Sequence, residues 1–380
     1  MTANAPEKPA AIRVLIAGGG TGGHLFPAIA IREALANLAT ERAVEVLFVG
    51  TKHGLEAQLL PRLGERLKFL WISGFAGKNP ARKLLVFVQL VVSMIQSAAL
   101  LASFRPHVVV GTGGFASGPI VFCAQLLGVP TLLQEQNAFP GLTTRLLARF
   151  AKKICVHFPE ASSKLPRPER VLVTGNPLRS SLTSVSQKQA RQFWGFDEER
   201  PVLLVVGGSL GARSINNALA DALGQILAQA NLLWQVGRTG LPPNADLALC
   251  DRATSSHQLV IREFIHEMPM AYAAANLALC RAGAITLAEL ALVGLPAILV
   301  PYPFAAHQHQ DWNAQAYEKM GAALRIPDHE LTGEKAGQTA LEILENSKRL
   351  QEMSDAMRTF AKPNAATDIA KIVMELGGKS

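Results

Sequence analysis

Short apolar runs alternate with helical patterns along the whole chain. Each run is rich in β-branched or aliphatic residues and is bounded by Gly, Pro or polar residues. Such alternation is typical of βαβ units that build a parallel sheet. In the first half of the chain, the predicted strands are 12–17, 44–49, 68–72, 108–110, 131–133, 154–157 and 171–173.

The pattern restarts after a polar, Ser/Thr-rich connection at 178–189. A second series of predicted strands follows at 202–206, 232–236, 259–261, 277–279 and 297–300. The chain is therefore predicted to be α/β, with two Rossmann-like doubly wound domains facing across a cleft. We assign 1–176 to the first domain and 177–362 to the second. The helix within 363–380 follows a Pro363-Asn364 break, and we expect it to return to the first domain.

One apolar stretch, 84–104, contains no charged residue and is long enough to span a bilayer. A spanning helix would split strands that belong to one sheet, so we favour a helix packed on that sheet with an exposed apolar patch at a membrane. A buried core helix is the alternative. The stretch carries one narrow polar stripe, Gln89, Ser93, Gln96, Ser97 and Ser103, and is preceded by three basic residues that could meet anionic headgroups, Lys78, Arg82 and Lys83.

Composition and charge limit the classes of molecule that the chain is expected to bind. Hydrophobic residues make up 49% of the chain and charged residues 17%, while aromatic residues are only 6%, so the core is aliphatic, as in covered parallel sheets. The net charge is +8, but no basic run is interleaved with aromatic residues, which disfavours nucleic acid as a partner. Anionic phospholipid and small anionic substrates fit this charge better.

The cysteines and the N-terminus indicate the compartment. The four cysteines form no CxxC pair and three lie in apolar runs, so buried, reduced thiols are expected. Residues 1–9 are polar and lack the apolar segment of a signal peptide. We therefore expect a cytoplasmic protein.

The first predicted strand runs into a glycine loop, 18–24, in which Gly18, Gly20 and Gly23 satisfy the spacing GxGxxG. Glycine lets the backbone approach a phosphate, and the following helix start supplies free amides. A dinucleotide-binding site would also need an acid closing the second strand to hold the ribose. That strand ends Val49-Gly50-Thr51-Lys52-His53, without an acid, so an NAD enzyme is disfavoured.

Two further glycine loops, 111–115 and 207–211, follow predicted strands. Each alone could be only a tight βα turn, but three together indicate a cleft that handles several phosphates. None matches the P-loop pattern.

In the second domain, Glu289 is predicted to lie near the opening of the same cleft. A strand end and a Gly-Ala turn precede it, and then a helix that starts near Thr286. A carboxylate at this position could hold both ribose hydroxyls. Alternatively, Glu289 only complements the helix dipole.

Five motifs occur in an order seen in one known family. They are Gly19-Gly20-Thr21-Gly22-Gly23-His24, Gln134-Glu135-Gln136-Asn137, Gly175-Asn176-Pro177-Leu178-Arg179, Gly207-Gly208-Ser209-Leu210-Gly211-Ala212-Arg213 and the stretch 281–289. With these motifs the chain resembles, from about 14 to 365, the MurG family of peptidoglycan N-acetylglucosaminyltransferases. Each motif alone is weak, and the set is highly specific.

The resemblance implies a GT-B fold, UDP-N-acetylglucosamine as donor, and conversion of undecaprenyl-diphosphate-linked N-acetylmuramoyl-pentapeptide (lipid I) to lipid II with inversion at the anomeric carbon. It also implies a peripheral location on the cytoplasmic face of the inner membrane, with cell-wall and division proteins as possible partners. Carried over by motif, the donor contacts are Thr21, Gly22, Gly23, Asn137, Arg179, Ser209, Ile265, Ala284, Ile285, Thr286, Leu287, Ala288, Glu289 and Gln310.

Within that set the resemblance assigns roles. Arg179 and Ser209 would meet the diphosphate, and Glu289 the ribose. The backbone of Ile265 would read uracil, and Asn137 and Gln310 would contact the sugar. The acceptor's diphosphate would lie against first-domain loops, at Gly20, Gly113 and Gly114.

At three places the sequence departs from the family's pattern, and each departure affects an individual predicted contact with the substrate. Leu210 stands where many relatives have Gln, and Ala282 where many have Ser, so polar contacts from those side chains are lost. His307-Gln308-His309-Gln310 differs from the acidic-His-Gln pattern often seen there. The choice of Gln310 therefore rests on its spacing to Asn313-Ala314.

The transfer needs a proton acceptor and stabilisation of the leaving UDP. No Asp-x-Asp occurs, so neither a metal clamp nor a cofactor is expected; Arg179, Ser209 and the helix near Thr286 could supply the stabilisation. The candidate bases are His24, because an unperturbed histidine suits a base near neutrality, and Glu135. For His24, acceptor binding without proton transfer stays open. A UDP-sugar epimerase of the same architecture and a non-catalytic scaffold are the alternative functions.

Overall fold

A computed structural model describes residues 11–39, 43–74, 80–208 and 210–378, with backbone only for 80–83 and 180–181. The chain divides into two compact units. Unit 1 comprises Met1–Leu178 and Pro363–Ser380, and unit 2 comprises Arg179–Lys362. The first boundary thus falls after Leu178 rather than after position 176.

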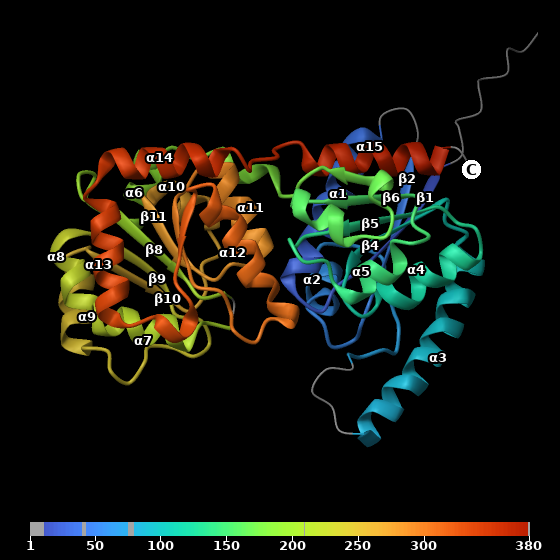
Figure 1. The fold of residues 1–380 in the computed structure, drawn as a ribbon, viewed down its shortest axis with the longest axis horizontal. Coiled ribbons are helices and arrows are strands. Elements are labelled where there is room, and N and C mark those ends of the chain that lie inside the picture. The colour runs from blue at the N-terminus through green and yellow to red at the C-terminus, as the bar shows by residue number, and fades with distance from the viewer. Residues whose placement is uncertain (1–10, 40–42, 75–79, 209, 379–380) are drawn as a thin grey trace, which may run out of the picture. The chain divides into compact units, whose positions relative to one another are not determined.

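Unit 1 is built on a seven-stranded, all-parallel sheet with strand order β3-β2-β1-β4-β5-β6-β7 (Figure 1). The order reverses between β1 and β4, as in a doubly wound sheet, and places the ends of these two strands beside each other. The strands are β1 (Ile12–Gly18), β2 (Val44–Gly50), β3 (Leu67–Phe69), β4 (Val108–Gly113), β5 (Thr131–Glu135), β6 (Lys153–Val156) and β7 (Val171–Val173).

Helices cover both faces of this sheet because its strands are apolar on both sides. One face packs against α1, α2 and α15, and the other against α3, α4 and α5. The helices are α1 (Gly22–Leu38), α2 (Glu56–Arg62), α3 (Pro80–Phe104), α4 (Ser117–Leu126), α5 (Leu142–Leu147) and α15 (Ala365–Gly378).

The last helix, α15, belongs to the core of unit 1. It lies along α1 and contacts β1 and β4 (Figure 1). Ile369, Ala370 and Val373 are fully buried there among residues of α1 and the central strands. The chain therefore completes the core of unit 1 only after it has formed unit 2.

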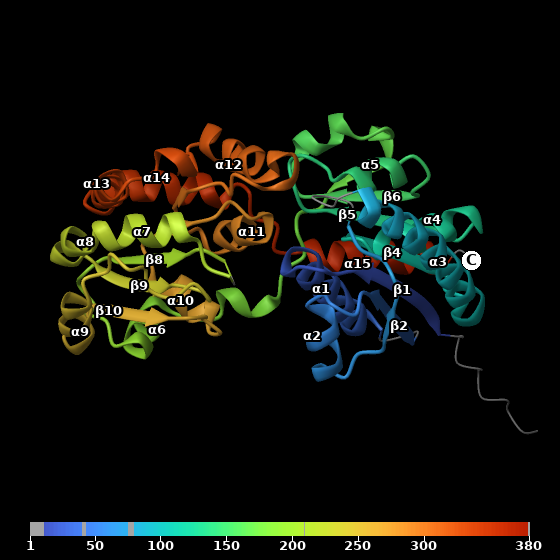
Figure 2. The same cartoon turned by 90° about the horizontal axis from the view of Figure 1, so that it is seen from below.

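Unit 2 repeats the architecture with a six-stranded parallel sheet of order β10-β9-β8-β11-β12-β13. Figure 2 shows α7 and α8 on one side of β8 and β9, and α6 and α10 on the other. The strands are β8 (Val202–Val206), β9 (Asn231–Gln235), β10 (Leu259–Arg262), β11 (Leu277–Cys280), β12 (Ala297–Leu299) and β13 (Ala323–Arg325). The helices are α6 (Gln187–Trp194), α7 (Arg213–Asp221), α8 (Leu223–Gln229), α9 (Leu247–Ser255), α10 (Met268–Ala274), α11 (Ala284–Val293), α12 (His309–Lys319), α13 (Gly333–Leu344) and α14 (Ser347–Arg358).

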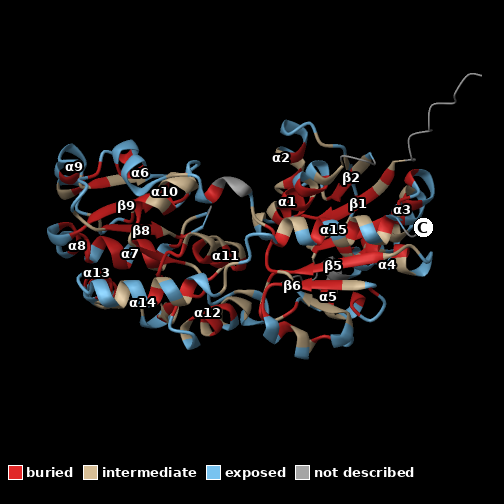
Figure 3. Cartoon of the chain, turned by 90° about the horizontal axis from the view of Figure 1, so that it is seen from above, coloured by how far each residue is buried: buried red, intermediate tan, exposed pale blue. Residues whose placement is uncertain are grey.

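Local signals set several helix ends. A capping box between Ser186 and Gln189 starts α6, and glycines with positive φ, Gly195 and Gly294, end α6 and α11. Figure 3 shows the strands of both sheets buried between helices whose outer faces are exposed. All four cysteines are buried and form no disulfide.

The predicted fold class, two Rossmann-like doubly wound domains, is confirmed by these two sheets. One strand, β13, is absent from the sequence-based prediction. It has only three residues, Ala323–Arg325, and lies at the sheet edge, so it lacks a recognisable apolar run. The helix predicted to start near Thr286 begins at Ala284, and the one expected from 84 begins at Pro80.

Helix α3 turns three of the five residues of its polar stripe inward, while Gln96 and Ser103 are exposed. Gln89, Ser93 and Ser97 are buried, and Gln89 accepts a hydrogen bond from the Ser73 hydroxyl (2.7 Å). The opposite face is apolar and exposed, by 45–68% for each of Leu84, Leu85, Phe87, Val88, Val91 and Ile95. The segment Leu84–Phe104 has a mean hydropathy of 2.2 and only 28% of it is buried. The helix therefore presents to its surroundings the kind of surface that soluble proteins usually bury.

Candidate functional site

Two glycine loops meet at the carboxyl ends of β1 and β4 in unit 1. A Cβ atom on Gly114 would lie 2.4 Å from the Gly19 carbonyl oxygen, and one on Gly113 would lie 2.6 Å from the His24 ring. Both positions also have positive φ, 83° and 100°. Only glycine fits these contacts, so the loops after β1 and β4 form one continuous surface beside His24.

A buried carboxylate that the sequence analysis missed fixes the first of these loops. Glu56, the first residue of α2, is fully buried and accepts hydrogen bonds from the Gly20 N–H (2.7 Å), the Thr51 N–H (2.7 Å) and the Thr51 hydroxyl (2.9 Å). Three glycines make room for it, since a Cβ on any of them would lie within 2.5 Å of an atom of the Glu56 side chain: Gly19, Gly50 and Gly54. The only sequence signal was an acid six residues after the end of β2, preceded by Gly50 and Gly54.

The Glu56 contact changes what the first loop can offer an anion. The Gly20 N–H, expected to face the acceptor's diphosphate, already donates to Glu56. Gly22 and Gly23 lie in the first turn of α1, where the helix supplies no carbonyl for their N–H groups. These two amides, rather than that of Gly20, are the ones that the loop can aim at a phosphate.

The orientation of His24 follows from its contact with the same loop. Its Nδ1 lies 3.1 Å from the Gly19 carbonyl oxygen, which can only accept a hydrogen bond. Nδ1 therefore carries the proton in the neutral ring, and Nε2 is the nitrogen with a lone pair. This is the tautomer that a general base needs.

Glu135, the second candidate base, is engaged by its own loop. It lies at the end of β5 and is only 3% exposed. Its Oε1 accepts from the N–H (3.1 Å) and the side-chain amide (3.2 Å) of Asn137, and its Oε2 accepts from the Gly141 N–H (3.1 Å). A carboxylate with both oxygens so occupied is suited to shaping the loop rather than to receiving a proton from a substrate.

Buried amides connect two motifs that are distant in the sequence. The Gln134 side chain donates to Asn176 Oδ1 (2.9 Å), and the Gln136 side chain donates to the Thr112 carbonyl (2.7 Å). The Asn176 N–H in turn donates to His157 Nδ1 (3.3 Å). This network ties the carboxyl ends of β4, β5, β6 and the chain after β7, so it supports the loops that carry Gly113 and Asn137.

In unit 2 the loops after β8 and β9 also touch. A Cβ on Gly211 would lie 2.3 Å from the Val236 carbonyl oxygen, which again requires glycine. Gly208 precedes Ser209, which lies outside the described residues. Gln235, a residue that the sequence analysis missed, donates from its amide to the Gly208 carbonyl (3.0 Å) and accepts from the Ile265 N–H (2.9 Å).

The start of α11 brings the remaining donor candidates together. The helix begins at Ala284 directly after Gly283, so Ala284, Ile285 and Thr286 present first-turn amides. Leu287 and Ala288 are buried behind them. Glu289 follows in the second turn of the same helix.

Glu289 has an unusual environment for a carboxylate. It accepts a hydrogen bond from the Tyr272 hydroxyl (2.7 Å), a contact that the sequence analysis did not foresee. Burial raises the pKa of Glu289 to about 7, although the Tyr272 hydrogen bond and the positive charge of Arg179 oppose that rise. Burial, with the neighbouring Glu289, also raises the pKa of Tyr272 well above its ordinary value, so the hydroxyl keeps its proton and donates. Glu289 is thus held in place while its charge is only partly compensated.

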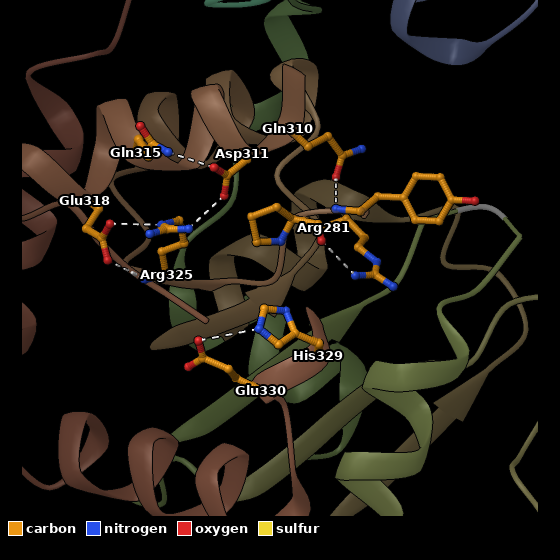
Figure 4. Close-up of polar contacts among 10 residues, drawn as sticks. Arg281, Gln310, Asp311, Gln315, Glu318, Arg325, His329 and Glu330 are labelled. Carbon is orange, nitrogen blue, oxygen red and sulfur yellow. Dashed lines mark hydrogen bonds and ion pairs between the residues drawn. The ribbon is translucent and has the colours of Figure 1, made fainter. Parts of the chain in front are cut away.

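Gln310 lies at the start of α12, beside an exposed aromatic loop. Its Oε1 accepts from the Tyr302 N–H (2.9 Å), and Figure 4 shows its amide nitrogen turned away from that contact. Among the described residues no partner takes a hydrogen bond from that nitrogen. Before it, His307 and Gln308 have positive φ (52° and 54°), a conformation that costs energy for residues other than glycine.

Charged residues around this loop hold it to the sheet. Arg281 pairs with Asp328 and donates to the carbonyls of Val300 (3.2 Å) and Pro301 (3.3 Å). Arg325 pairs with Asp311 (2.8 Å) and Glu318 (3.1 Å) (Figure 4). Both arginines are engaged by protein partners, as expected of residues that position the loop. In the described parts of the chain no group of three His, Cys, Asp or Glu residues could hold a metal ion.

Comparison with known proteins gives the family. The glycosyltransferase family 28 N-terminal domain matches residues 14–156, and the glycosyltransferase family 28 C-terminal domain matches residues 202–371. A protein of Prosthecochloris aestuarii, named UDP-N-acetylglucosamine--N-acetylmuramyl-(pentapeptide) pyrophosphoryl-undecaprenol N-acetylglucosamine transferase, is 44% identical over 94% of this chain and 97% of its own length. The chain belongs to the MurG family of glycosyltransferases.

Solved structures agree with this assignment. The crystal structure of Acinetobacter baumannii MurG superposes with a TM-score of 0.77 at 30% identity, covering 96% of this chain and 99% of that one. The expected GT-B fold class is confirmed by that match. A putative UDP-N-acetylglucosamine 2-epimerase from Listeria monocytogenes has a TM-score of 0.66 at 16% identity, covering 98% of each chain, and at that identity it shares the fold alone.

We predict that Glu56→Gln lowers the free energy of unfolding of unit 1 by about 1–3 kcal/mol, because a carboxamide NH2 would replace one acceptor and face a main-chain N–H. Amide hydrogen exchange at Gly20 and Thr51 should accelerate, as measured by NMR or mass spectrometry. Glu33→Gln, on the exposed side of α1, is the matched control and should change neither quantity. Unchanged exchange at Gly20 in Glu56→Gln would contradict the anchoring role.

Proposed function

We propose that this chain transfers N-acetylglucosamine from UDP-N-acetylglucosamine to the muramoyl 4-hydroxyl of undecaprenyl-diphosphate-linked MurNAc-pentapeptide (lipid I), with inversion, giving lipid II. The observation that carries the proposal is the 44% identity, across nearly the whole chain, to a relative named for this transfer. The epimerase alternative has only a fold-level likeness behind it, at 16% identity.

The donor contacts in unit 2 have specific chemistry. The first-turn amides of α11 offer hydrogen bonds and a positive dipole end to the diphosphate, together with Arg179 and Ser209. Glu289 accepts from the ribose hydroxyls, and the amide nitrogen of Gln310 donates to a sugar hydroxyl. Contacts from unit 1, at Thr21, Gly22, Gly23 and Asn137, stay predictions of the motif resemblance.

The proton acceptor that we favour is His24. Its Nδ1 proton is directed to the Gly19 carbonyl, which leaves Nε2 to take the proton of the muramoyl hydroxyl as the new bond forms. Glu135 is less suited, because its two oxygens accept three hydrogen bonds from Asn137 and Gly141. Negative charge that develops on the departing UDP is stabilised by Arg179 and the start of α11.

We further propose that unit 1 docks on the cytoplasmic face of the inner membrane through α3. Both ends of α3 lead into strands of one sheet, β3 and β4, so the helix lies on the bilayer surface rather than across it. Its apolar face is exposed, and the adjoining α4 adds Phe122 and Leu126, with Leu127 directly after the helix. Lys78, expected to meet headgroups, lies outside the described residues. Cell-wall and division proteins stay possible partners on the strength of the resemblance.

The proposed reaction is tested by transfer of radiolabelled N-acetylglucosamine from UDP to a short-chain lipid I analogue, with EDTA present. We expect a labelled disaccharide-lipid, since Arg179 and the α11 amides can stabilise UDP without a metal. In the same assay His24→Ala should lower kcat roughly 100-fold or more, with little change in UDP-N-acetylglucosamine affinity. Tight UDP binding without any product would return the epimerase and scaffold functions to consideration, and an unchanged kcat would exclude His24 as the base.

The pKa of Glu289, about 7, predicts how donor affinity depends on pH. The ionised carboxylate accepts from ribose hydroxyls, so UDP-N-acetylglucosamine should bind roughly tenfold more weakly one pH unit below that pKa. Tyr272→Phe removes a hydrogen bond that lowers the pKa, and should move the loss of affinity to higher pH. Calorimetric titration between pH 6 and 8.5 measures both effects. Glu289→Gln is the control: its affinity should be weak and independent of pH, and a wild-type profile in that variant would refute the assignment.

Membrane docking through α3 predicts a loss of vesicle binding when its exposed face is made polar. Leu84→Ser combined with Ile95→Ser removes two side chains that are 68% and 66% exposed. Co-sedimentation with vesicles that contain anionic phospholipid should weaken at least tenfold, because each side chain contributes about 1.5–3 kcal/mol when it enters the bilayer. Met320→Ser, at an exposed apolar residue of unit 2, should leave binding unchanged. Equal losses in the two variants would argue against a specific α3 surface.

A further inference from the structure

Gln235 occupies a special place in the unit 2 sheet. It is the last residue of β9, and its main chain pairs with Val206 on one side and Arg262 on the other. These two are the last residues of β8 and β10. The loops that follow β8 and β10 therefore leave the sheet on either side of Gln235.

The side chain of Gln235 reaches both loops at once. It is only 2% exposed; its Nε2 donates to the Gly208 carbonyl (3.0 Å) and its Oε1 accepts from the Ile265 N–H (2.9 Å). One planar amide thus supplies a donor to one loop and an acceptor to the other. Glutamate could keep only the acceptor, and leucine neither, so the pair of contacts requires a carboxamide of this length.

We propose that Gln235 is a positioning residue that sets the base specificity of the donor site. The inference rests on the proposed function and on two roles that the motif resemblance implies: Ser209, next to Gly208, would meet the diphosphate, and the Ile265 main chain would meet the base. By bonding to both, Gln235 fixes the distance between the phosphate-binding loop and the base-reading residue. A nucleotide can span only a limited range of distances between its base and its diphosphate, so the contacts of Gln235 influence whether both groups are bound together.

The same contact determines which base is accepted. Since the Ile265 N–H is used by Gln235, the main-chain group that Ile265 retains for a ligand is its carbonyl, to which no described residue donates a hydrogen bond. A carbonyl only accepts. Uracil presents N3–H as a donor, whereas N3 of cytosine is an acceptor, so a carbonyl held at this position favours uracil over cytosine.

The sheet itself does not depend on this side chain. Beyond Gln235, the Val236 N–H donates to the Arg262 carbonyl (3.0 Å) and the Gly237 N–H donates to the Glu263 carbonyl (3.0 Å). These main-chain bonds keep β9 and β10 paired when the amide is removed. Gln235→Leu, which conserves most of the side-chain volume, is therefore expected to fold.

The test is calorimetric titration of the full chain with UDP and with CDP, for the wild type, Gln235→Leu and Gln235→Glu. We expect the wild type to prefer UDP, and Gln235→Leu to bind UDP roughly tenfold more weakly with a much smaller change for CDP, so that the preference falls by a similar factor. Gln235→Glu keeps the acceptor for Ile265 but repels the Gly208 carbonyl, and its UDP preference should fall less than that of Gln235→Leu.

The control separates positioning from loss of stability. Asn276 lies at the opposite, amino ends of the strands, where its Oδ1 accepts from the Val202 N–H (2.9 Å) and from Arg191 (2.8 Å). Asn276→Ala thus removes two side-chain amide contacts away from both loops. It should lower Tm and leave the ratio of UDP to CDP affinity unchanged. The inference is overturned if Gln235→Leu weakens UDP and CDP equally, or behaves like Asn276→Ala. If the wild type binds CDP as tightly as UDP, the result instead contradicts the proposal that the donor is a UDP-sugar, and the proposed role of Gln235 fails with it.

Discussion

Close approach of main chain to main chain at the carboxyl ends of the strands is the constraint on which both units depend. In unit 1, Gly114 lies against Gly19, and in unit 2 a Cβ on Gly237 would lie 2.1 Å from the Gly211 nitrogen. In unit 1 these loops follow β1 and β4, where the strand order reverses, and in unit 2 they follow the neighbouring strands β8 and β9. A side chain at either contact would push the loops apart. The helices that follow the first loop of each pair, α1 and α7, begin at Gly22 and Arg213, directly behind these contacts.

The acidic residues near these loops differ in the number of hydrogen bonds they accept, and this difference distinguishes structural carboxylates from one that can bind a ligand. Glu56 and Glu135 each accept three hydrogen bonds, mostly from the main chain of loops that would otherwise have unsatisfied N–H groups. Glu289 accepts one, from the Tyr272 hydroxyl, and its pKa rises to about 7. A carboxylate whose two oxygens are occupied by protein donors shapes the fold, whereas the partly buried Glu289 keeps acceptor capacity and remains able to bind a ligand.

The features that could be predicted from the sequence are those encoded by neighbouring residues. Apolar runs gave the strands of both sheets except β13, and glycine clusters gave the loops. Glu56, Gln235 and Tyr272 could not be found in that way, because each acts on a partner from another loop or helix and none lies in an informative local pattern. The direction of the polar stripe on α3 was also undetermined, since periodicity shows that a helix has two faces but not which one meets the protein.

Helix α15 has a consequence for the order in which the chain acquires its structure during synthesis. Ile369, Ala370 and Val373 complete the core of unit 1, yet they are made after every residue of unit 2. At roughly 5–20 residues per second, the ribosome needs about 10–40 s to add the part of the chain that follows Leu178. Through that interval the nascent N-terminal half has an open apolar face over β1 and β4, while the whole of unit 2 can emerge and fold ahead of it. Unit 1, most of which is synthesised first, is thus the last to complete its core. It is therefore the unit whose exposed apolar surface chaperones would need to protect from aggregation.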